Sequence, residues 1–293
     1  MHVISSHSFP QIYEDIAQRL LALGQRVEGS TRWQGQDIRT QPDMVPIELQ
    51  NVIFEMNMPA RKDVAASYTQ PNLPWAEDHF QERVGGVPLN PPPSAAHWPH
   101  AQAGHSSHTD HWGQFSHTYP ERFWPRHAGH DISGYCSTAR ADEMCPAGPQ
   151  AGIRFQLGDL RDVVNLLIKD PETRQAYLPV WFSEDTGATQ GQRVPCTLGY
   201  HFMIRDNQLH VTYLIRAVDF VRHFRDDVYM AIRLAQWVNH QFNLDVSNPK
   251  VMMGNLTMHT MSMHCFAGDL HALEQFADGY GRRKSESLLR SLR

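Results

Sequence analysis

The chain has 293 residues, of which 41% are hydrophobic, so it can bury a substantial core in one α/β domain or two. Its net charge of −5 provides no broad positive field, which disfavours general nucleic-acid binding but leaves room for small anionic ligands held by local arginines. The four cysteines, Cys136, Cys145, Cys196 and Cys265, share no short repeated spacing, which excludes a disulfide framework and a Cys-x-x-Cys zinc site.

The first residues, 1–10, lack the basic region and apolar core of a secretion signal. No stretch approaches the roughly eighteen consecutive apolar residues that a membrane span requires. We therefore expect a cytoplasmic protein with no membrane segment, no nucleic-acid partner and no bound metal.

Four segments carry clear patterns in chain order. Residues 11–23 have the apolar spacing of an amphipathic helix that ends at Gly24. Residues 46–56 are rich in Ile, Val and Phe and predict a strand. Residues 158–169 and 231–242 predict two later helices, whose apolar faces we expect to lie in the core.

The segment 85–112 differs from its surroundings. It begins with a run rich in Gly and Pro and continues with five histidines, His97, His100, His105, His108 and His111. These histidines have no fixed spacing on a predictable element and no cysteine partners, so a solvated loop is favoured over a metal site. We expect one domain over residues 1–293, with this segment as a loop or insertion.

Cys196 stands at the head of an alternating run, residues 200–216, in which Asp206 and Asn207 form a turn signal. The resulting hairpin would bring Cys196 and Arg216 to one cleft. The pattern becomes helical from about residue 228. Asp227 would therefore lie at the start of a helix.

This stretch resembles the thymidylate synthase family, whose motif is Pro-Cys-His before a strand, Gln-Arg-Ser-x-Asp, and then Pro-Phe-Asn opening a helix. In one ungapped register, Cys196 falls on the family's nucleophile and Arg216 on its phosphate-binding arginine. Asp219 falls on the aspartate that contacts folate, and Asp227 replaces the asparagine that recognises uracil. Ala217 replaces the serine that follows the phosphate arginine.

Other matches are shorter. His264 and Phe266 resemble the family's His-x-Tyr, which holds the sugar, although Phe266 lacks the hydroxyl. Arg174 resembles the first of two arginines that cross a dimer to the partner's phosphate, and Gln175 stands in the second place. The resemblance covers roughly residues 155–270.

The match is thinner upstream, where Arg32 resembles part of a phosphate loop and Tyr119 part of the Tyr-Gly-x-x-x-Trp segment. The resemblance as a whole implies an α/β fold with a mixed β-sheet and flanking helices. It also implies a homodimer, in which Arg174 reaches the other subunit's nucleotide phosphate.

Asp227 indicates which base the protein recognises. Uracil offers an N3–H donor beside an O4 acceptor, whereas cytosine offers an N3 acceptor beside an amino donor. A carboxyl group that stays protonated in a dry pocket matches cytosine, and the same exchange occurs in the cytidylate hydroxymethylases that the family includes. The alternative is that Asp227 only caps its helix.

The resemblance implies a covalent mechanism. The Cys196 thiolate would add to C6 of the ring, and C5 would attack the methylene of 5,10-methylenetetrahydrofolate. Water would trap the resulting exocyclic methylene as hydroxymethyl, whereas hydride would give methyl. The basic segment 281–293 would exclude water poorly and so favours hydration. The alternative for Cys196 is that it is a small buried hydrophobic residue. The alternative for segment 281–293 is that it is a surface tail without a role in the chemistry.

Three positions depart from the family in ways that bear on the chemistry. His79 stands where the family has a catalytic glutamate, although a shift of one helical turn would bring Glu77 or Glu82 there. Ala217 and Phe266 leave room near the sugar, which favours CMP over dCMP.

The sequence thus predicts 5-hydroxymethylation of a cytidine monophosphate. Thymidylate-type C5 methylation is one alternative. A non-catalytic nucleotide-binding protein is the other.

Overall fold

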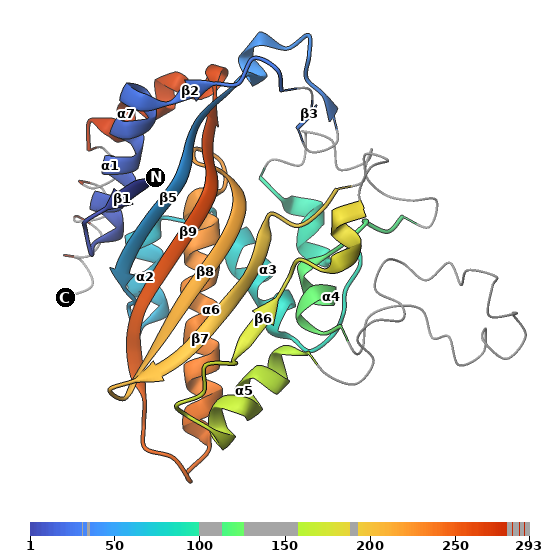
Figure 1. Cartoon of the computed structure of the whole chain (residues 1–293), viewed down its shortest axis with the longest axis vertical. Helices are drawn as coiled ribbons and strands as arrows, with labels where there is room; N and C mark the ends of the chain where they lie inside the picture. The colour runs from blue at the N-terminus through green and yellow to red at the C-terminus, as the bar shows by residue number, and fades with distance from the viewer. Residues whose placement is uncertain are drawn as a thin grey trace, which may run out of the picture.

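The structure, a computed structural model, describes residues 1–30, 32–33, 36–99, 113–125, 158–187, 193–279 and the isolated positions 283, 287 and 290. Within these residues the chain forms a mixed seven-stranded β-sheet flanked by helices, so the predicted fold class is confirmed (Figure 1). The sheet runs in the order β1-β5-β9-β8-β7-β6, and β2 pairs with β5 outside that path.

The strands are β1 (His2–Ile4), β2 (Gln25–Arg26), β3 (Arg32–Trp33), β4 (Gln36–Asp37), β5 (Pro46–Asn57), β6 (Tyr177–Pro179), β7 (Thr197–Arg205), β8 (Gln208–Asp219) and β9 (Met252–Phe266). The helices are α1 (Phe9–Leu23), α2 (Lys62–Thr69), α3 (Trp75–Val84), α4 (Tyr119–Phe123), α5 (Leu160–Lys169), α6 (Phe224–Leu244) and α7 (Leu270–Ala277). Short 3-10 turns are η1 (Pro42–Met44), η2 (Pro93–His97), η5 (Ser183–Gly187) and η6 (Ala267–Asp269).

The predicted hairpin is present. β7 and β8 are antiparallel, and the turn residues Asp206 and Asn207 both have positive φ, 49° and 55°, as a tight hairpin turn requires. At the other end, the amide of Arg216 donates to the carbonyl of Cys196 at 2.9 Å. The hairpin therefore fixes the two residues side by side.

Helix α1 begins at Phe9, two residues before the predicted start, because Pro10 is accommodated in a first turn that needs no amide hydrogen bond. It ends before Gly24, as predicted. A Cβ at Gly24 would lie 2.3 Å from the Leu20 carbonyl oxygen, so the close approach of the chain requires glycine there.

Helix α6 extends the prediction in both directions and runs behind the sheet, in contact with β8 and β9 (Figure 1). Its first turn carries Asp226 and Asp227, and the chain enters it from Asp219 at the end of β8. Helix α5 starts at Leu160, because Asp159 forms a capping box with Asp162.

The described part of segment 85–112 differs from the expected solvated loop. Ser94 in η2 is 1% exposed, and Trp98 packs against the core. This stretch lies against α3 because its serine hydrogen-bonds a glutamate of that helix. His97 is described, whereas the other four histidines lie outside the described residues.

No helix among the described residues is long and apolar enough to cross a membrane.

Candidate active site

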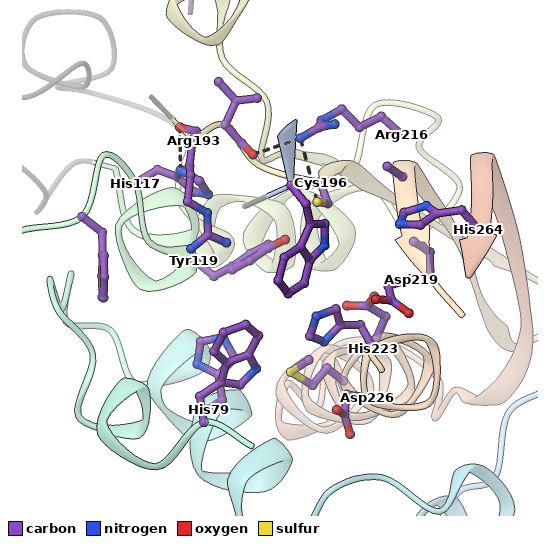
Figure 2. A pocket seen from close by; sticks show the side chains of 18 of the residues that line it. His79, His117, Tyr119, Arg193, Cys196, Arg216, Asp219, His223, Asp226 and His264 are labelled. Carbon is purple, nitrogen blue, oxygen red and sulfur yellow. Dashed lines mark hydrogen bonds between the residues drawn. The ribbon is translucent and has the colours of Figure 1, made fainter. Parts of the chain in front are cut away.

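A pocket of about 760 Å³ lies where β8, β9 and the start of α6 meet α3, η2, α4 and the segment before β7 (Figure 2). Nine residues singled out from the sequence line it: His79, Tyr119, Cys196, Arg216, Ala217, Asp219, Asp227, His264 and Phe266. The structure thus brings together residues that are up to about 190 positions apart in the chain.

Cys196 and Arg216 lie next to each other on one wall. The Arg216 guanidinium donates to the carbonyls of Pro195 at 2.8 Å and Val194 at 3.2 Å, and one nitrogen lies 3.9 Å from the Cys196 sulfur. These backbone contacts fix the guanidinium over the thiol, as Figure 2 shows.

The charge balance around the thiol is mixed. Burial raises the pKa of Cys196 above its ordinary value, Arg216 and Arg193 act to lower it, and the charge of Asp227 acts to raise it. The two guanidiniums therefore favour the thiolate against the effect of burial. A protonated Asp227 would remove one of the opposing influences.

The two acids of the α6 first turn differ in their surroundings. Asp226 is 2% exposed and accepts hydrogen bonds from the amide of Asn72 at 2.7 Å and its side chain at 2.8 Å. Both acids line the pocket, but no described residue hydrogen-bonds the carboxyl of Asp227. Asp226 anchors the helix, whereas Asp227 remains available to a ligand.

Burial raises the pKa of Asp227 to about 7, against the opposing charge of Arg83 and with the help of Asp226 and Asp219. The carboxyl is therefore partly protonated near neutral pH. The helix cap is His223, and the Asp227 amide already donates to the His223 carbonyl at 2.9 Å. The capping alternative for Asp227 finds no support in this geometry.

Asp219 lies at the end of β8. Burial raises its pKa to about 7, although the charge of Arg222 opposes this. Its Oδ1 accepts from the Arg222 amide at 3.0 Å, while Oδ2 has no hydrogen-bond partner among the described residues and lies 3.8 Å from the Arg222 guanidinium. A buried carboxylate oxygen without a hydrogen bond is suited to a ligand N–H donor.

The end of β9 forms another wall. His264 lines the pocket, and burial lowers its pKa to about 4, so the ring is neutral at pH 7. Phe266 packs edge-on against Trp33, with ring centroids 5.5 Å apart. This contact brings β3 to the pocket, although the side chain of Arg32 itself lies outside the described residues.

His79 faces the pocket from α3, whereas the two alternative glutamates do not line it. Glu77 binds Arg233 and the Tyr229 hydroxyl on another side of the helix. Glu82 lies behind His79, with its carboxylate 3.4 Å from the His79 Nδ1. Of the three candidates, only the imidazole is presented to a ligand.

Tyr119 contacts Thr197, the residue that follows Cys196. Its hydroxyl lies 3.1 Å from the Thr197 hydroxyl, which in turn lies 2.9 Å from that of Tyr213. Burial raises the pKa of Tyr119, so the phenol stays protonated. The Arg83 guanidinium lies 3.9 Å from the centre of its ring.

Several pocket residues belong to no sequence motif that marks them as functional: Arg83, Trp98, His117, Arg193 and His223. Arg193 is the most informative of them, because burial lowers its pKa and no described side chain pairs with its guanidinium. Its position three residues before Cys196 is the only sequence signal that would have indicated it. Figure 2 shows its guanidinium directed into the pocket.

Arg174 lies apart from these residues. Its side chain is exposed, it does not line the pocket of its own chain, and its carbonyl accepts a hydrogen bond from His201 at 3.0 Å. Within the described residues, no group of three or more His, Cys, Asp or Glu side chains is arranged to hold a metal ion.

Comparison with known proteins gives one relative of note. The chain is 27% identical over 117 residues to a protein of Methanococcoides burtonii named "Putative thymidylate synthase". The matched region covers 40% of this chain and 50% of that protein, so the chain spans about half the length of the curated relative it matches. No model of a known protein family matches the chain.

This similarity supports the resemblance to the thymidylate synthase family that the motifs around Cys196 indicate. The pocket combines a thiol, two neighbouring guanidiniums, a carboxyl that titrates near neutral pH and a neutral imidazole. Such a set can bind an anion, recognise a heterocycle by hydrogen bonds and form a covalent bond to it.

Proposed function

We propose that the protein transfers a one-carbon unit from 5,10-methylenetetrahydrofolate to C5 of a cytidine monophosphate, CMP or dCMP, and that water completes a 5-hydroxymethyl product. The observation that carries this proposal is the position of Asp227. A carboxyl with a pKa of about 7 shares one pocket with Cys196 and has no hydrogen-bonding partner there among the described residues.

Base recognition follows from the protonated form of Asp227. Its O–H donates to N3 of cytosine and its carbonyl oxygen accepts from the 4-amino group. Uracil presents an N3–H to that O–H, which leaves a mismatched pair of donors. A mismatch of this kind in a buried site costs about 1–3 kcal/mol, or roughly tenfold to a hundredfold in selectivity.

The covalent steps use Cys196. Its thiolate adds to C6 while Asp227 donates to N3, and the electron pair of the C5=C6 bond becomes available at C5. C5 then bonds to the methylene of the folate while one of the two C–N bonds of that methylene breaks, and the freed nitrogen takes the proton given up by the Cys196 thiol. Loss of the C5 proton and of tetrahydrofolate leaves the exocyclic methylene, to which water adds as the C6–S bond breaks.

Binding of the two substrates draws on the remaining walls. Arg216 and Arg193 are suited to the nucleotide phosphate, and Oδ2 of Asp219, which accepts no hydrogen bond among the described residues, suits an N–H of the folate ring. The rings of Trp33 and Trp98, which line the pocket, provide flat apolar surface for the folate ring. The exposed Arg174 then binds the phosphate of the nucleotide held by a partner subunit.

The remaining pocket residues bear on the choice of sugar and on the step that traps the exocyclic methylene. Ala217 and Phe266 both line the pocket without offering a hydroxyl, which favours CMP over dCMP. Methylation by hydride transfer would use the same residues up to the exocyclic methylene. The segment 281–293, which bears on the exclusion of water, lies outside the described residues except at positions 283, 287 and 290.

Incubation with CMP, dCMP and dUMP, each with methylenetetrahydrofolate, tests the proposal by mass analysis of the products. A gain of about 30 mass units on a cytidine nucleotide is expected for hydroxymethyl, because CH₂O is added. A gain of about 14 would instead indicate a methyl group. Nucleotide binding without any product would indicate a non-catalytic protein.

A further inference from the structure

Behind the pocket wall, His79 belongs to a largely buried chain of three polar side chains, in which Ser94 is fully buried and His79 and Glu82 are 12% and 13% exposed. Its Nδ1 lies 3.0 Å from the Ser94 hydroxyl and 3.4 Å from a Glu82 oxygen. The Ser94 hydroxyl donates to Glu82 Oε2, and the Ser94 amide donates to Oε1 at 2.6 Å. Helix α3 supplies two members and η2 the third.

The direction of these hydrogen bonds fixes the tautomer of His79. The Ser94 hydroxyl has one proton, which it donates to the Glu82 carboxylate, so its oxygen can only accept from His79. The imidazole must therefore carry its proton on Nδ1. Nε2 then has a free lone pair, as the basic nitrogen of a neutral ring.

The ring has little freedom to turn. It stacks on Trp75 with centroids 5.1 Å apart and planes 17° from parallel, and it meets Tyr119 edge-on at 6.2 Å. With Nδ1 held by Ser94, the ring lines the pocket that contains Cys196 (Figure 2).

We propose that Ser94 and Glu82 are positioning residues that hold His79 as a neutral base, with Nε2 carrying the proton that leaves C5 of the nucleotide. This inference rests on the proposed function. The resembled family has a glutamate at the position that handles protons. Here an imidazole takes that role, with a serine and a glutamate behind it.

The proton balance closes with one imidazole. When the C5–H bond breaks, its electron pair forms the double bond to the exocyclic methylene as the bond to the folate nitrogen breaks. The proton passes to Nε2 and then to the nitrogen of the departing tetrahydrofolate. The neutral ring next accepts a proton from the water that adds to the methylene, and that proton returns to the departing Cys196 thiolate.

The local charges suit a base that is neutral at rest. Burial and the charge of Arg83 lower the pKa of His79 to about 4, while Glu82 acts in the opposite direction. Burial acts to raise the pKa of Glu82, but the hydrogen bonds from His79 and Ser94 outweigh it and keep the carboxyl ionised. The carboxylate thus stabilises the transient imidazolium through Ser94.

The test separates proton removal from the steps before it. Release of tritium from nucleotide labelled at C5 reports loss of the C5 proton. A 5-fluoro nucleotide with methylenetetrahydrofolate has no such proton to lose, so it should trap Cys196 covalently before that step. His79→Gln and Ser94→Ala should form the fluoro adduct as the wild type does, which also shows that they are folded.

Tritium release should fall by about a hundredfold or more in His79→Gln and about tenfold in Ser94→Ala and Glu82→Gln, with the nucleotide KM unchanged. The control is His97→Gln, because His97 lies in the same turn, half exposed near Asp78, and does not line the pocket. It should release tritium at the wild-type rate.

The inference is overturned if Ser94→Ala and Glu82→Gln release tritium at the wild-type rate, or if His79→Gln loses the fluoro adduct together with tritium release. If the wild type itself neither releases tritium nor forms product from CMP or dCMP, the proposed function fails instead.

Discussion

The two walls of the pocket are built in different ways. The first wall consists of the β7–β8 hairpin, with Cys196 directly before β7, and the first turn of α6, and it carries Cys196, Arg216 and Asp227. The facing wall comes from helix α3, the turn η2 and the loop residues 193–195, and it carries His79, Arg83 and Arg193 among others. In the proposed reaction, the first wall supplies the bonding and recognition groups, whereas the facing wall supplies charge and proton handling.

This difference predicts how substitutions on each wall should behave. Changes on the first wall should remove the reaction or change the base, because those groups contact the reacting ring in the proposed reaction. Changes on the facing wall should alter rate or affinity while base choice persists.

Cys196→Ala should have the largest effect. Without a sulfur to bond to C6, turnover should fall by at least about a thousandfold. Product formation measured by mass checks this. Cys265→Ala is the matched control, since Cys265 is buried in the core beyond the pocket, and it should keep full activity while unfolding at a slightly lower temperature.

Asp227→Asn should exchange the preferred base. An amide presents an acceptor to the N3–H of uracil and a donor to O4. The value of kcat/KM for the cytidine nucleotide should therefore fall by about a hundredfold, while activity on the uridine nucleotide is gained. Competition between the two nucleotides measures the exchange. Asp226→Asn should instead weaken the contact with Asn72 and leave base preference unchanged; a base switch there would contradict the assignment.

Affinity for the cytidine nucleotide should depend on pH. The pKa of Asp227 is raised to about 7, so the protonated form that binds cytosine predominates below that value and is lost as pH rises above it. The dissociation constant should therefore rise by about tenfold per unit well above pH 7. Calorimetric titration at several pH values, with Asp227→Asn and a uridine nucleotide as the reference, separates this effect from ionisation of the phosphate.

Arg193→Gln should have the smallest effect. Its charge favours the Cys196 thiolate and faces the pocket, so its removal should raise the nucleotide KM by about tenfold and slow alkylation of Cys196 by iodoacetamide. Arg205→Gln, at the far end of the hairpin, should change neither quantity. An altered base preference in Arg193→Gln would break the distinction between the two walls.

The same difference explains what the sequence can predict. The hairpin, helix α6 and the proximity of Cys196 to Arg216 follow from period, turn residues and strand pairing, which are local properties of the chain. The entry of Arg193 into the pocket follows from no such pattern. It depends on how a segment without regular structure packs against distant elements.

His79 lies between these cases. The family resemblance indicated the residue, but the sequence left Glu77 and Glu82 as alternatives one turn away. Only packing decides between them, since Glu77 binds Arg233 and Glu82 lies behind the imidazole beside Ser94. The buried position of Ser94 was not predicted because its surroundings are rich in proline and have no periodic pattern.

The most direct test of the central claim is the intact mass of the protein after incubation with methylenetetrahydrofolate and a 5-fluoro nucleotide. The wild type should gain the mass of both ligands with a fluorocytidine monophosphate, in its ribo or deoxyribo form, and Cys196→Ala should gain none. Trapping of the fluorouridine nucleotide in preference to the cytidine one, or an adduct that persists without the Cys196 sulfur, would contradict recognition by Asp227 and bonding through Cys196.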